Sequence, residues 1–353
     1  MRPLNLALIG AGNIMAHRHL PFLVKHPRQY QIVAISDRHP EKARRLARQY
    51  GIPHVWPSNH FQEQHPYPWF KKIDAIVIAT PPFTHADLIQ AALPYGKHLL
   101  VEKPFVVDLS RGEALIKQAR RQGLILAVNH NFQFATSVQK LKHLMSQKKQ
   151  GRLLSLSLQQ FSNEERRLPQ WTEKLPLGLV YDETPHFIYL TEMITDAPLV
   201  CQHAALIKSP HSPATPQILT AQFQAGKIPV NMYLNFNSPI CEWLVIAIFA
   251  HRFVLVDLFR DILINLPSDG QHLGKEVIRT SLLTTYQHWA QFIQNGPKYL
   301  TGNFWWGFDE VYNRFYRAVL NHDLTGIKPL DASRGLHVNQ VQHTIISKAL
   351  SLL

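Results

Sequence analysis

The sequence predicts an α/β protein of two domains, a doubly wound parallel sheet in residues 1–130 and a second α/β domain in residues 131–353. Three observations support this prediction. Over the first 130 residues, short apolar runs alternate with helical segments. After that point, runs of alternating apolar and polar residues follow one another without helices between them, which is typical of a large, open, mainly antiparallel sheet. A glycine-rich turn directly follows the first apolar run.

Five strands are expected in the first domain. Each is a short, almost continuous apolar run, as is usual when helices cover both faces of a parallel sheet. The expected strands are Leu4–Ile9, Gln31–Ser36, Ile73–Ala79, His98–Val101 and Leu124–Val128.

The helices of the first domain have recognisable ends. His39–Tyr50 is expected to be helical because a proline suits its first position and a glycine follows its last residue. Thr84 can cap the next helix. Ser110 and Glu113 have the spacing of a capping box for a helix that ends near Gly123.

The second domain is expected to contain seven strands and four helices. Its strands are expected within Leu153–Phe161, Val200–Ile207, Ile218–Phe223, Ile228–Phe236, Trp243–Phe249, Phe253–Phe259 and Ile262–Leu266. Its helices are expected near Pro185–Ile194, Val277–Gln294, Asp309–Leu320 and Ala332–Leu350. The proline-rich segment Ser209–Pro216 is expected to form a surface loop between two strands.

Length and composition narrow the class of protein. A chain of 353 residues, 46% of them hydrophobic, suits two domains with sizeable cores. No apolar run reaches about 18 residues, so no membrane-spanning helix is expected. A strand is expected within a few residues of Met1, so no signal peptide is expected. Cys201 and Cys241 have no metal or redox spacing, so free thiols and a cytoplasmic location are expected.

The chain is basic, with 37 Lys and Arg against 24 Asp and Glu and a net charge of +13. Such a surface attracts anions. The basic residues are scattered and have no aromatic residues interleaved, so nucleic acid is not the expected partner. The partner that we expect is instead a phosphorylated or nucleotide-linked small molecule.

The turn after the first strand has the spacing of a dinucleotide-binding loop. In Gly10-x-Gly12-x-x-Met15, the first glycine permits a tight turn and the second lets the backbone approach a pyrophosphate closely. Asn13 and Ile14 continue this turn and are expected beside the cofactor. Met15 replaces the usual third glycine, so the packing of helix on strand is expected to readjust.

The end of the second strand points to the identity of the dinucleotide. Asp37 can accept hydrogen bonds from both ribose hydroxyls, which favours NAD. Arg38 follows it and could pair with a 2′-phosphate, so NADP stays open.

Two stretches carry a resemblance to a known family. Ile76–His85 and Gly96–Pro104, which contains Val101-Glu102-Lys103-Pro104, closely resemble the Gfo/Idh/MocA oxidoreductases. The resemblance covers the first 130 residues well and is looser afterwards. It implies a Rossmann domain that carries NAD or NADP, and a second domain that supplies the substrate pocket and an oligomer-forming sheet. It also implies cofactor contacts from residues of the matching loops, namely Thr80, Pro81, His85, Glu102 and Lys103.

The resemblance also implies the catalytic residues. Lys103 is similar in position to the family's active-site lysine, and Asp182 and His186 to its acid–base pair. A histidine has a suitable pKa to take the hydroxyl proton while hydride leaves carbon. Lys103 would stabilise the developing alkoxide. Asp182 and His186 are four residues apart, so on a helix they share one face. Because a proline is tolerated in the first helical turn, Pro185 is expected there, and Asp182 is expected at or near the N-cap.

The chain departs from the family pattern around this pair. Thr184 stands where a glycine is usual, and Tyr189 stands where the family often has an aspartate. Trp171 and Tyr181 could wall a substrate pocket or pack in a core, and Asn131 could bind substrate or form a turn. His17 and His19 are expected to diverge on the first helix, and no metal site is expected.

The sequence therefore predicts an NAD(P)-dependent dehydrogenase or reductase of a sugar, polyol or sugar derivative. A catalytically silent dinucleotide-binding regulator, and a redox-neutral epimerase or glycosidase with recycled NAD, are the alternatives. A homodimer or homotetramer through the C-terminal sheet is expected, as the resemblance implies.

Overall fold

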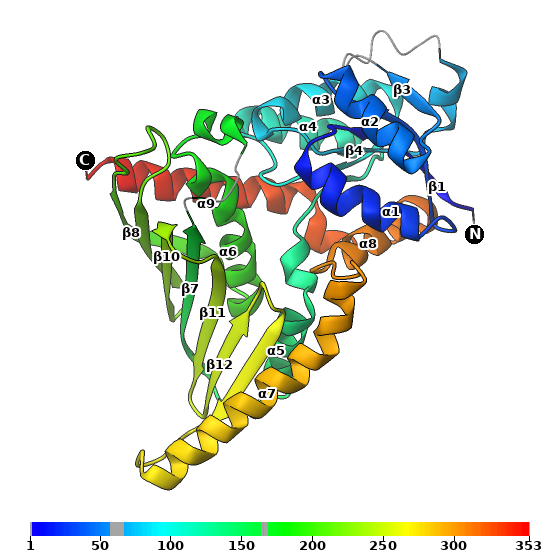
Figure 1. The fold of residues 1–353 in the computed structure, drawn as a ribbon. Helices are drawn as coiled ribbons and strands as arrows, with labels where there is room; N and C mark the ends of the chain where they lie inside the picture. Colours follow the sequence, from blue (N-terminus) through cyan, green and yellow to red (C-terminus); the bar gives the residue numbers. More distant parts are fainter. Residues whose placement is uncertain (1, 57–66, 164, 166–168, 353) are drawn as a thin grey trace. The chain divides into compact units, whose positions relative to one another are not determined.

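The computed structural model describes residues 2–56, 67–163, 165 and 169–352, and it forms two compact units (Figure 1). The first unit consists of Met1–His130 and Phe308–Gln340, and the second of Asn131–Gly307 and Val341–Leu353. The sequence analysis placed everything after residue 130 in one domain, and that division stays a prediction. The aromatic side of Phe308–Asn321 explains the return to the first unit, because Tyr312 stacks on Phe22 with ring centroids 5.2 Å apart.

The first unit contains a six-stranded parallel sheet in the order β3-β2-β1-β4-β5-β6, which confirms the doubly wound fold. Chain order reverses between β1 and β4, and such a switch point is where open α/β sheets bind ligands. The sequence analysis missed β3, a three-residue edge strand. The strands are β1 (Leu4–Ile9), β2 (Tyr30–Ser36), β3 (His54–Trp56), β4 (Ala75–Ile78), β5 (His98–Val101) and β6 (Leu126–Val128).

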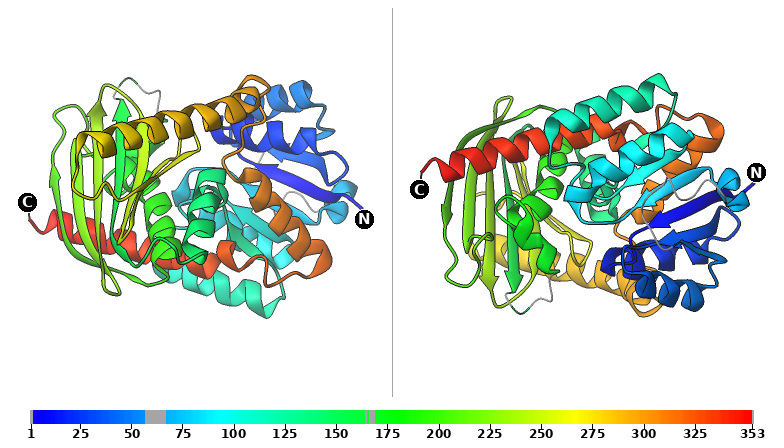
Figure 2. Two further views of the ribbon diagram at one scale, coloured as in Figure 1. Left: turned by 90° about the horizontal axis from the view of Figure 1, so that it is seen from below. Right: turned by 90° about the horizontal axis from the view of Figure 1, so that it is seen from above.

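Helices cover both faces of this sheet (Figure 2). One expected cap is wrong, because Ser110 does not begin its helix. The N-cap is Asp108, whose Oδ1 accepts the backbone N–H groups of Ser110 and Arg111 at 2.9 and 3.1 Å. Thr84 does occupy the N-cap of its helix, but its hydroxyl donates to the carbonyl of Pro81. The α-helices are α1 (Leu20–Lys25), α2 (Pro40–Tyr50), α3 (His85–Ala92), α4 (Leu109–Arg121), α8 (Phe308–Asn321) and the first half of α9 (Ala332–Leu350).

The second unit contains a seven-stranded sheet in the order β13-β12-β11-β7-β10-β9-β8. Every neighbouring pair is antiparallel except β10 and β7, so the predicted mainly antiparallel sheet is confirmed. The strands are β7 (Leu153–Asn163), β8 (Leu199–Ile207), β9 (Ile218–Ala225), β10 (Ile228–Ser238), β11 (Glu242–Phe249), β12 (Arg252–Asp257) and β13 (Ile262–Pro267).

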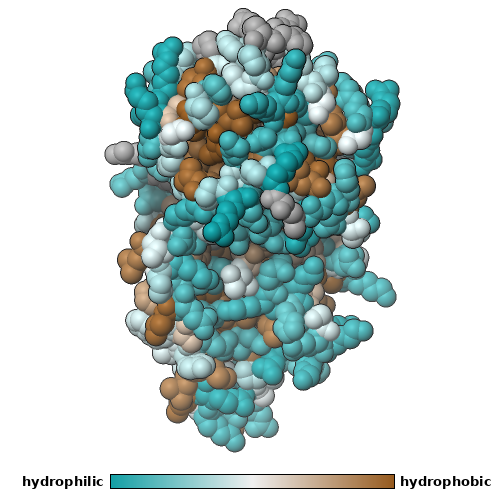
Figure 3. All heavy atoms as spheres, turned by 90° about the vertical axis from the view of Figure 1, so that its right-hand side faces the viewer, coloured by the Kyte–Doolittle hydropathy of each residue, from teal (hydrophilic) through white to brown (hydrophobic). Residues whose placement is uncertain are grey.

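The second unit's helices include one that the sequence analysis did not expect, α5 (Thr136–Ser146). The others are α6 (Leu179–Thr195), α7 (Gly274–Leu300) and the second half of α9. Among the described residues, none of the helices is both long and apolar enough to cross a membrane. Hydrophobic side chains nevertheless reach the surface, for example at the lower end of the face drawn in Figure 3.

Helix α6 is longer than predicted, and it contains Pro185 in its interior rather than in its first turn. A proline has no N–H, so the carbonyl of Tyr181, four residues earlier, loses its helical partner. The side-chain amide of Gln342 replaces that partner, because its Nε2 donates to Tyr181 O at 2.6 Å and to Thr184 Oγ1 at 2.8 Å. An interaction from a distant helix therefore lets α6 continue through the proline.

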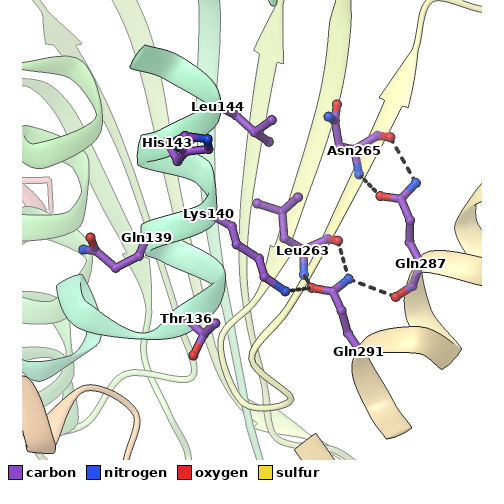
Figure 4. A pocket seen from close by; sticks show the side chains of 9 residues that line it. All are labelled: Thr136, Gln139, Lys140, His143, Leu144, Leu263, Asn265, Gln287 and Gln291. Carbon is purple, nitrogen blue, oxygen red and sulfur yellow. Dashed lines mark hydrogen bonds between the residues drawn. The ribbon is translucent and has the colours of Figure 1, made fainter. Parts of the chain in front are cut away.

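Side-chain amides also cover the edge of the sheet at β13 (Figure 4). Gln287 accepts from the N–H of Asn265 and donates to its carbonyl, at 2.8 and 3.1 Å. Gln291 makes the same pair of bonds with Leu263, at 3.1 and 2.7 Å, and also accepts from Lys140 at 2.9 Å. The two glutamines thus bond to the backbone groups that an edge strand otherwise leaves exposed.

The Gln291→Ala variant should be less stable than the wild type by about 1–3 kcal/mol, because it leaves the buried N–H and carbonyl of Leu263 without partners. The midpoint of urea-induced unfolding measures this. Gln294→Ala is the matched control, since Gln294 is exposed on the same helix. Equal midpoints for the two variants would contradict the role given to Gln291.

Candidate active site

The predicted site residues of the first unit follow the carboxyl ends of its strands. Gly10 follows β1, Asp37 follows β2, Thr80 closely follows β4 and Glu102 follows β5. In a parallel sheet these ends share one edge, so the fold gathers residues that lie far apart in the sequence.

The two glycines of the predicted dinucleotide loop differ in what requires them. Gly10 has a φ of +99°, and a Cβ there would lie 2.3 Å from the carbonyl oxygen of Ala79. The fold itself therefore requires Gly10. A Cβ on Gly12 would meet no atom within 4 Å, and Gly12, Asn13 and Ile14 are exposed. The turn thus leaves open space where a phosphate would approach.

A widened helical turn follows the glycine turn and begins at Met15. Met15 is fully buried, and Met15–His19 forms a π-helical turn that leads into α1. His17 is exposed and His19 is fully buried, so the two histidines diverge as predicted. Among the residues that the structure describes, no group of three or more His, Cys, Asp or Glu side chains could hold a metal ion.

Asp37 holds the glycine turn against the end of β2. Its Oδ2 accepts the N–H of Ala11 at 2.6 Å, and its Oδ1 accepts the N–H of His39 at 2.8 Å. Each carboxylate oxygen has a second lone pair, so both bonds are compatible with acceptance from a ribose. Arg38 is exposed and donates to His39 Nε2 at 3.2 Å. The preference for NAD over NADP stays a prediction.

A buried chain of hydrogen bonds lies behind the loop that carries Lys103. Tyr312 Oη lies 2.6 Å from His19 Nδ1, and His19 Nε2 lies 2.8 Å from Glu102 Oε1. The amide of Asn129 donates to the same oxygen of Glu102 at 2.7 Å. All four side chains are buried. Sequence reasoning found Glu102 through the family resemblance but gave no role to His19 or Tyr312, since only the fold brings them together.

Two groups of this hydrogen-bonded set, Tyr312 and Glu102, have pKa values displaced from their ordinary values. Burial raises the pKa of Tyr312 well above its ordinary value, so its hydroxyl stays protonated. Burial alone would raise the pKa of Glu102. Three neighbouring residues outweigh the effect of burial and hold the pKa of Glu102 below its ordinary value. They are His19, through its hydrogen bond and its charge, Asn129, through its hydrogen bond, and Lys103, through its charge. Glu102 is therefore a buried carboxylate stabilised by its donors.

Lys103 is half-buried, and its position depends on this carboxylate. Its backbone N–H donates to Glu102 Oε2 at 3.1 Å, and the peptide bond to Pro104 is cis. Glu102 thus links the backbone of the predicted catalytic lysine to the buried Tyr312–His19 pair.

His85 connects two loops at the same edge of the sheet. It is fully buried, with Nε2 2.9 Å from the carbonyl of Thr80 and Nδ1 3.0 Å from that of Pro104. Burial lowers the pKa of His85. The contacts give His85 a part in positioning the loops. The direct cofactor contact implied by the resemblance, like those of Thr80 and half-buried Pro81, stays a prediction.

In the second unit, α6 carries His186, which is 6% exposed. Its Nδ1 lies 2.7 Å from the hydroxyl of Tyr189, which also accepts the N–H of Phe132 at 3.2 Å. The rings of Phe132 and Trp243 pack against the imidazole edge-on, at 4.8 and 5.1 Å between centroids. Tyr189, where the chain departs from the family pattern, is thus the residue that orients the imidazole.

Asp182 lies in the first turn of α6 and is half-buried. The N-cap of the helix is Gly178, so the expectation that Asp182 would be at or near the N-cap is corrected by the longer helix. Asp182 and His186 keep the spacing of four on one helix that was predicted. The acid–base role of Asp182 stays a prediction.

The remaining predicted substrate residues differ in exposure. Tyr181 is fully buried, with its hydroxyl 3.4 Å from His343 Nε2, which favours the core-packing interpretation. Asn131 is 6% exposed and its amide donates to the carbonyl of Trp306 at 2.9 Å. Trp171 is half-buried in a short 3-10 helix (Gln170–Lys174). Substrate contacts by Asn131 and Trp171 stay predictions.

Lys103 belongs to the first unit and Asp182 and His186 to the second, so their convergence on one substrate also stays a prediction. A cavity of about 500 Å³ lies within the second unit, between α5, β13 and α7 (Figure 4). No predicted site residue is among those that line it: Thr136, Gln139, Lys140, His143, Leu144, Leu263, Asn265, Gln287 and Gln291.

Fold and site together define a dinucleotide-binding α/β protein. Residues 4–130 match the Gfo/Idh/MocA model, which is described as an oxidoreductase family with an NAD-binding Rossmann fold. Residues 4–130 therefore match the NAD-binding domain of this family, as the sequence analysis predicted.

Named relatives include enzymes of nucleotide sugars. Over 126 residues, the chain is 34% identical to dTDP-3,4-didehydro-2,6-dideoxy-alpha-D-glucose 3-reductase of Streptomyces antibioticus. This match covers 36% of this chain and 36% of that enzyme. The chain thus spans about a third of the length of that relative.

Solved structures share the whole fold at low identity. UDP-N-acetylglucosamine 3-dehydrogenase GnnA of Acidithiobacillus ferrooxidans has a TM-score of 0.72 at 17% identity, over 99% of both chains. The WlbA dehydrogenase of Bordetella pertussis, in complex with NADH and UDP-GlcNAcA, has a TM-score of 0.77 at 16% identity, over 100% of this chain and 98% of that one.

Acidification should destabilise the wild type relative to the Glu102→Gln variant. Because the folded-state pKa of Glu102 lies below its ordinary value, its carboxylate contributes stability that is present above about pH 4.3 and is lost as the pH falls through the folded pKa. Urea unfolding between about pH 7 and pH 3 measures the difference. Glu113→Gln, on the surface of α4, is the control. A Glu102→Gln difference that does not change with pH would contradict the stabilised carboxylate.

Proposed function

We propose that this protein is an NAD(P)-dependent oxidoreductase that transfers a hydride between the nicotinamide and a carbinol or carbonyl carbon of a sugar derivative. The observation that carries the proposal is the pairing, at one sheet edge, of an open glycine turn with a lysine held by a buried carboxylate. The turn fits a pyrophosphate, and the lysine supplies a positive charge near the reacting carbon.

The residues at the edge of the first sheet fit the dinucleotide. Open space beside Gly12 suits close approach of the pyrophosphate to the backbone, and the helical segment begins there, since the N–H of Ala16 donates to Gly12 O at 3.0 Å. Asp37 is available to the adenosine ribose. When bound, the nicotinamide accepts or returns a hydride.

The chain's own residues handle the charge and the proton. Lys103 stabilises negative charge on the substrate oxygen, an effect worth on the order of 100-fold or more in rate. When His186 Nδ1 donates to Tyr189 Oη, Nε2 is the basic nitrogen that takes the hydroxyl proton; with the proton on Nε2, the same ring acts as the acid in reduction. Asp182, one helical turn before His186, stabilises the charged imidazole.

A nucleotide-linked sugar is the substrate class that we favour. Two of the relatives act on dTDP- or UDP-linked sugars by name, and a third was solved with UDP-GlcNAcA. The net charge of +13 also attracts a substrate that carries a diphosphate.

Substitutions at the two loop glycines should have different effects, one on cofactor binding and the other on stability. Gly12→Val should fold as well as the wild type, because no atom opposes a side chain there, but should weaken NAD(H) binding at least about 10-fold by filling the space for the phosphate. Gly10→Ala should lose stability, because its Cβ would meet Ala79 O at 2.3 Å. Thermal unfolding and titration with NADH and NADPH measure both. Unimpaired NADH binding by Gly12→Val would contradict the proposed cofactor site.

Removing either proposed catalytic group should slow turnover strongly without weakening cofactor binding. Lys103→Ala and His186→Ala should each lower kcat with UDP- or dTDP-linked sugars on the order of 100-fold or more, with NADH affinity changed little. His203→Ala, at an exposed histidine of β8, is the control.

A screen of nucleotide sugars, sugar phosphates and polyols gives the substrate class. Wild-type rates in both variants would contradict the assigned catalytic residues. Tight NADH binding with no turnover of any substrate in the wild type would instead support the regulator considered from the sequence.

A further inference from the structure

Two buried polar atoms on neighbouring strands have no hydrogen-bond partner among the described residues. They are the side-chain oxygen Oε1 of Gln160, on β7, and the indole nitrogen Nε1 of Trp243, on β11. Gln160 is fully buried, and Trp243 is 4% exposed. Burying a polar atom without a partner is costly, so each such atom in a folded protein needs an explanation.

The register of the second sheet places these two residues side by side. Gln160 and Trp243 are directly opposite each other in the antiparallel pair of β7 and β11. Opposite residues of such a pair have Cβ atoms about 5 Å apart and point to the same face of the sheet. Buried residues alternate with more exposed ones along both strands, and Gln160 and Trp243 belong to the buried series.

The buried face of these strands is also the face on which the proposed acid–base residue lies. The ring of Trp243 is 5.1 Å from that of His186 and 5.3 Å from that of Phe187, between centroids, and both of these residues are on α6. Helix α6 also packs against β7. The pair formed by Gln160 and Trp243 therefore lies on the His186 side of the sheet, within one unit.

The two atoms have complementary chemistry, although neither is bonded to the other. An indole N–H can only donate, and an amide oxygen can only accept. The other end of the amide is already used, because Gln160 Nε2 donates to Ser162 Oγ at 3.2 Å. A hydroxyl group both donates and accepts, so a single hydroxyl would satisfy both atoms. Hydroxyls are also the polar groups that a sugar ring carries in the largest number.

We propose that Gln160 and Trp243 bind one hydroxyl of the sugar substrate. Trp243 Nε1 donates to the hydroxyl oxygen, and the hydroxyl donates its proton to Gln160 Oε1. This inference rests on the proposed function and adds two specificity-determining residues to it. A substrate analogue that lacks this hydroxyl leaves both buried atoms without partners, so the site discriminates strongly against the corresponding deoxy sugar.

Binding of deoxy sugars to the full chain, loaded with NADH, tests this proposal. Isothermal titration calorimetry compares UDP-glucose with its monodeoxy analogues. The wild type should bind one of these analogues about 100-fold more weakly than UDP-glucose. Gln160→Met and Trp243→Phe should each reduce that preference about 10-fold or more, mainly by weakening the binding of UDP-glucose. Met keeps the length of the side chain without its acceptor, and Phe keeps a ring beside His186 without the donor.

The matched control is Gln159→Met, which makes the same substitution on the opposite face of β7, at a half-buried residue. It should keep the wild-type preference. Thermal unfolding shows that each variant is folded at the temperature of the titration. A deoxy preference that is the same in the wild type and in both site variants overturns the proposal, and indicates that the two atoms hold only an ordered water. A wild type that binds no nucleotide sugar also overturns it.

Turnover of the same nucleotide sugars separates this inference from the proposed function. If the wild type turns over a sugar but its deoxy preference does not depend on Gln160 or Trp243, the hydroxyl site is wrong and the proposed function stands. If the preference depends on both residues but no sugar is oxidised or reduced, the hydroxyl site stands and the proposed function is wrong.

Discussion

The first unit depends on one buried carboxylate. Glu102 receives hydrogen bonds from His19, Asn129 and the backbone of Lys103, which come from three different segments of the chain. Burying an unpaired carboxylate is very costly, so the loss of any of these three donors would destabilise this geometry. The loops that would hold cofactor and substrate are thereby positioned by a constraint in the interior rather than by contacts at the surface.

The second unit solves a comparable problem with neutral amides. Gln342 bonds to the carbonyl that Pro185 leaves without a partner, and Gln287 and Gln291 bond to the exposed edge of β13. Because a side-chain amide carries both donors and an acceptor, it can replace a missing backbone partner of either kind. These bonds let α6 carry His186 on a continuous helix, and they fix α7 with its apolar side outward.

The sequence was informative where structure depends on neighbouring residues. The apolar runs of the first 130 residues predicted five of six parallel strands. Alternation in four segments, and three closely spaced apolar segments after them, predicted the seven strands of the second sheet. Errors arose where another side chain overrode the signal that was read. The neighbouring Asp108 accepts the N–H of Ser110, which was expected to begin its helix, and the distant Gln342 bonds to the carbonyl that Pro185 leaves without a partner. The short strand β3 has too few residues to show a pattern.

By itself, the sequence determined the fold class from its pattern of apolar runs, and it predicted the dinucleotide turn from the spacing of its glycines. The lysine after β5 was identified only through the resemblance to a family. Only the tertiary structure decided that His19 and Tyr312 support Glu102, that Tyr189 orients His186, and that the polar side of α7 faces inward. Some of these contacts join residues that are far apart in the sequence, so no local pattern predicts them. In the case of Tyr189, the residue differs from the one that the family pattern leads us to expect, so its role becomes evident only in the folded structure.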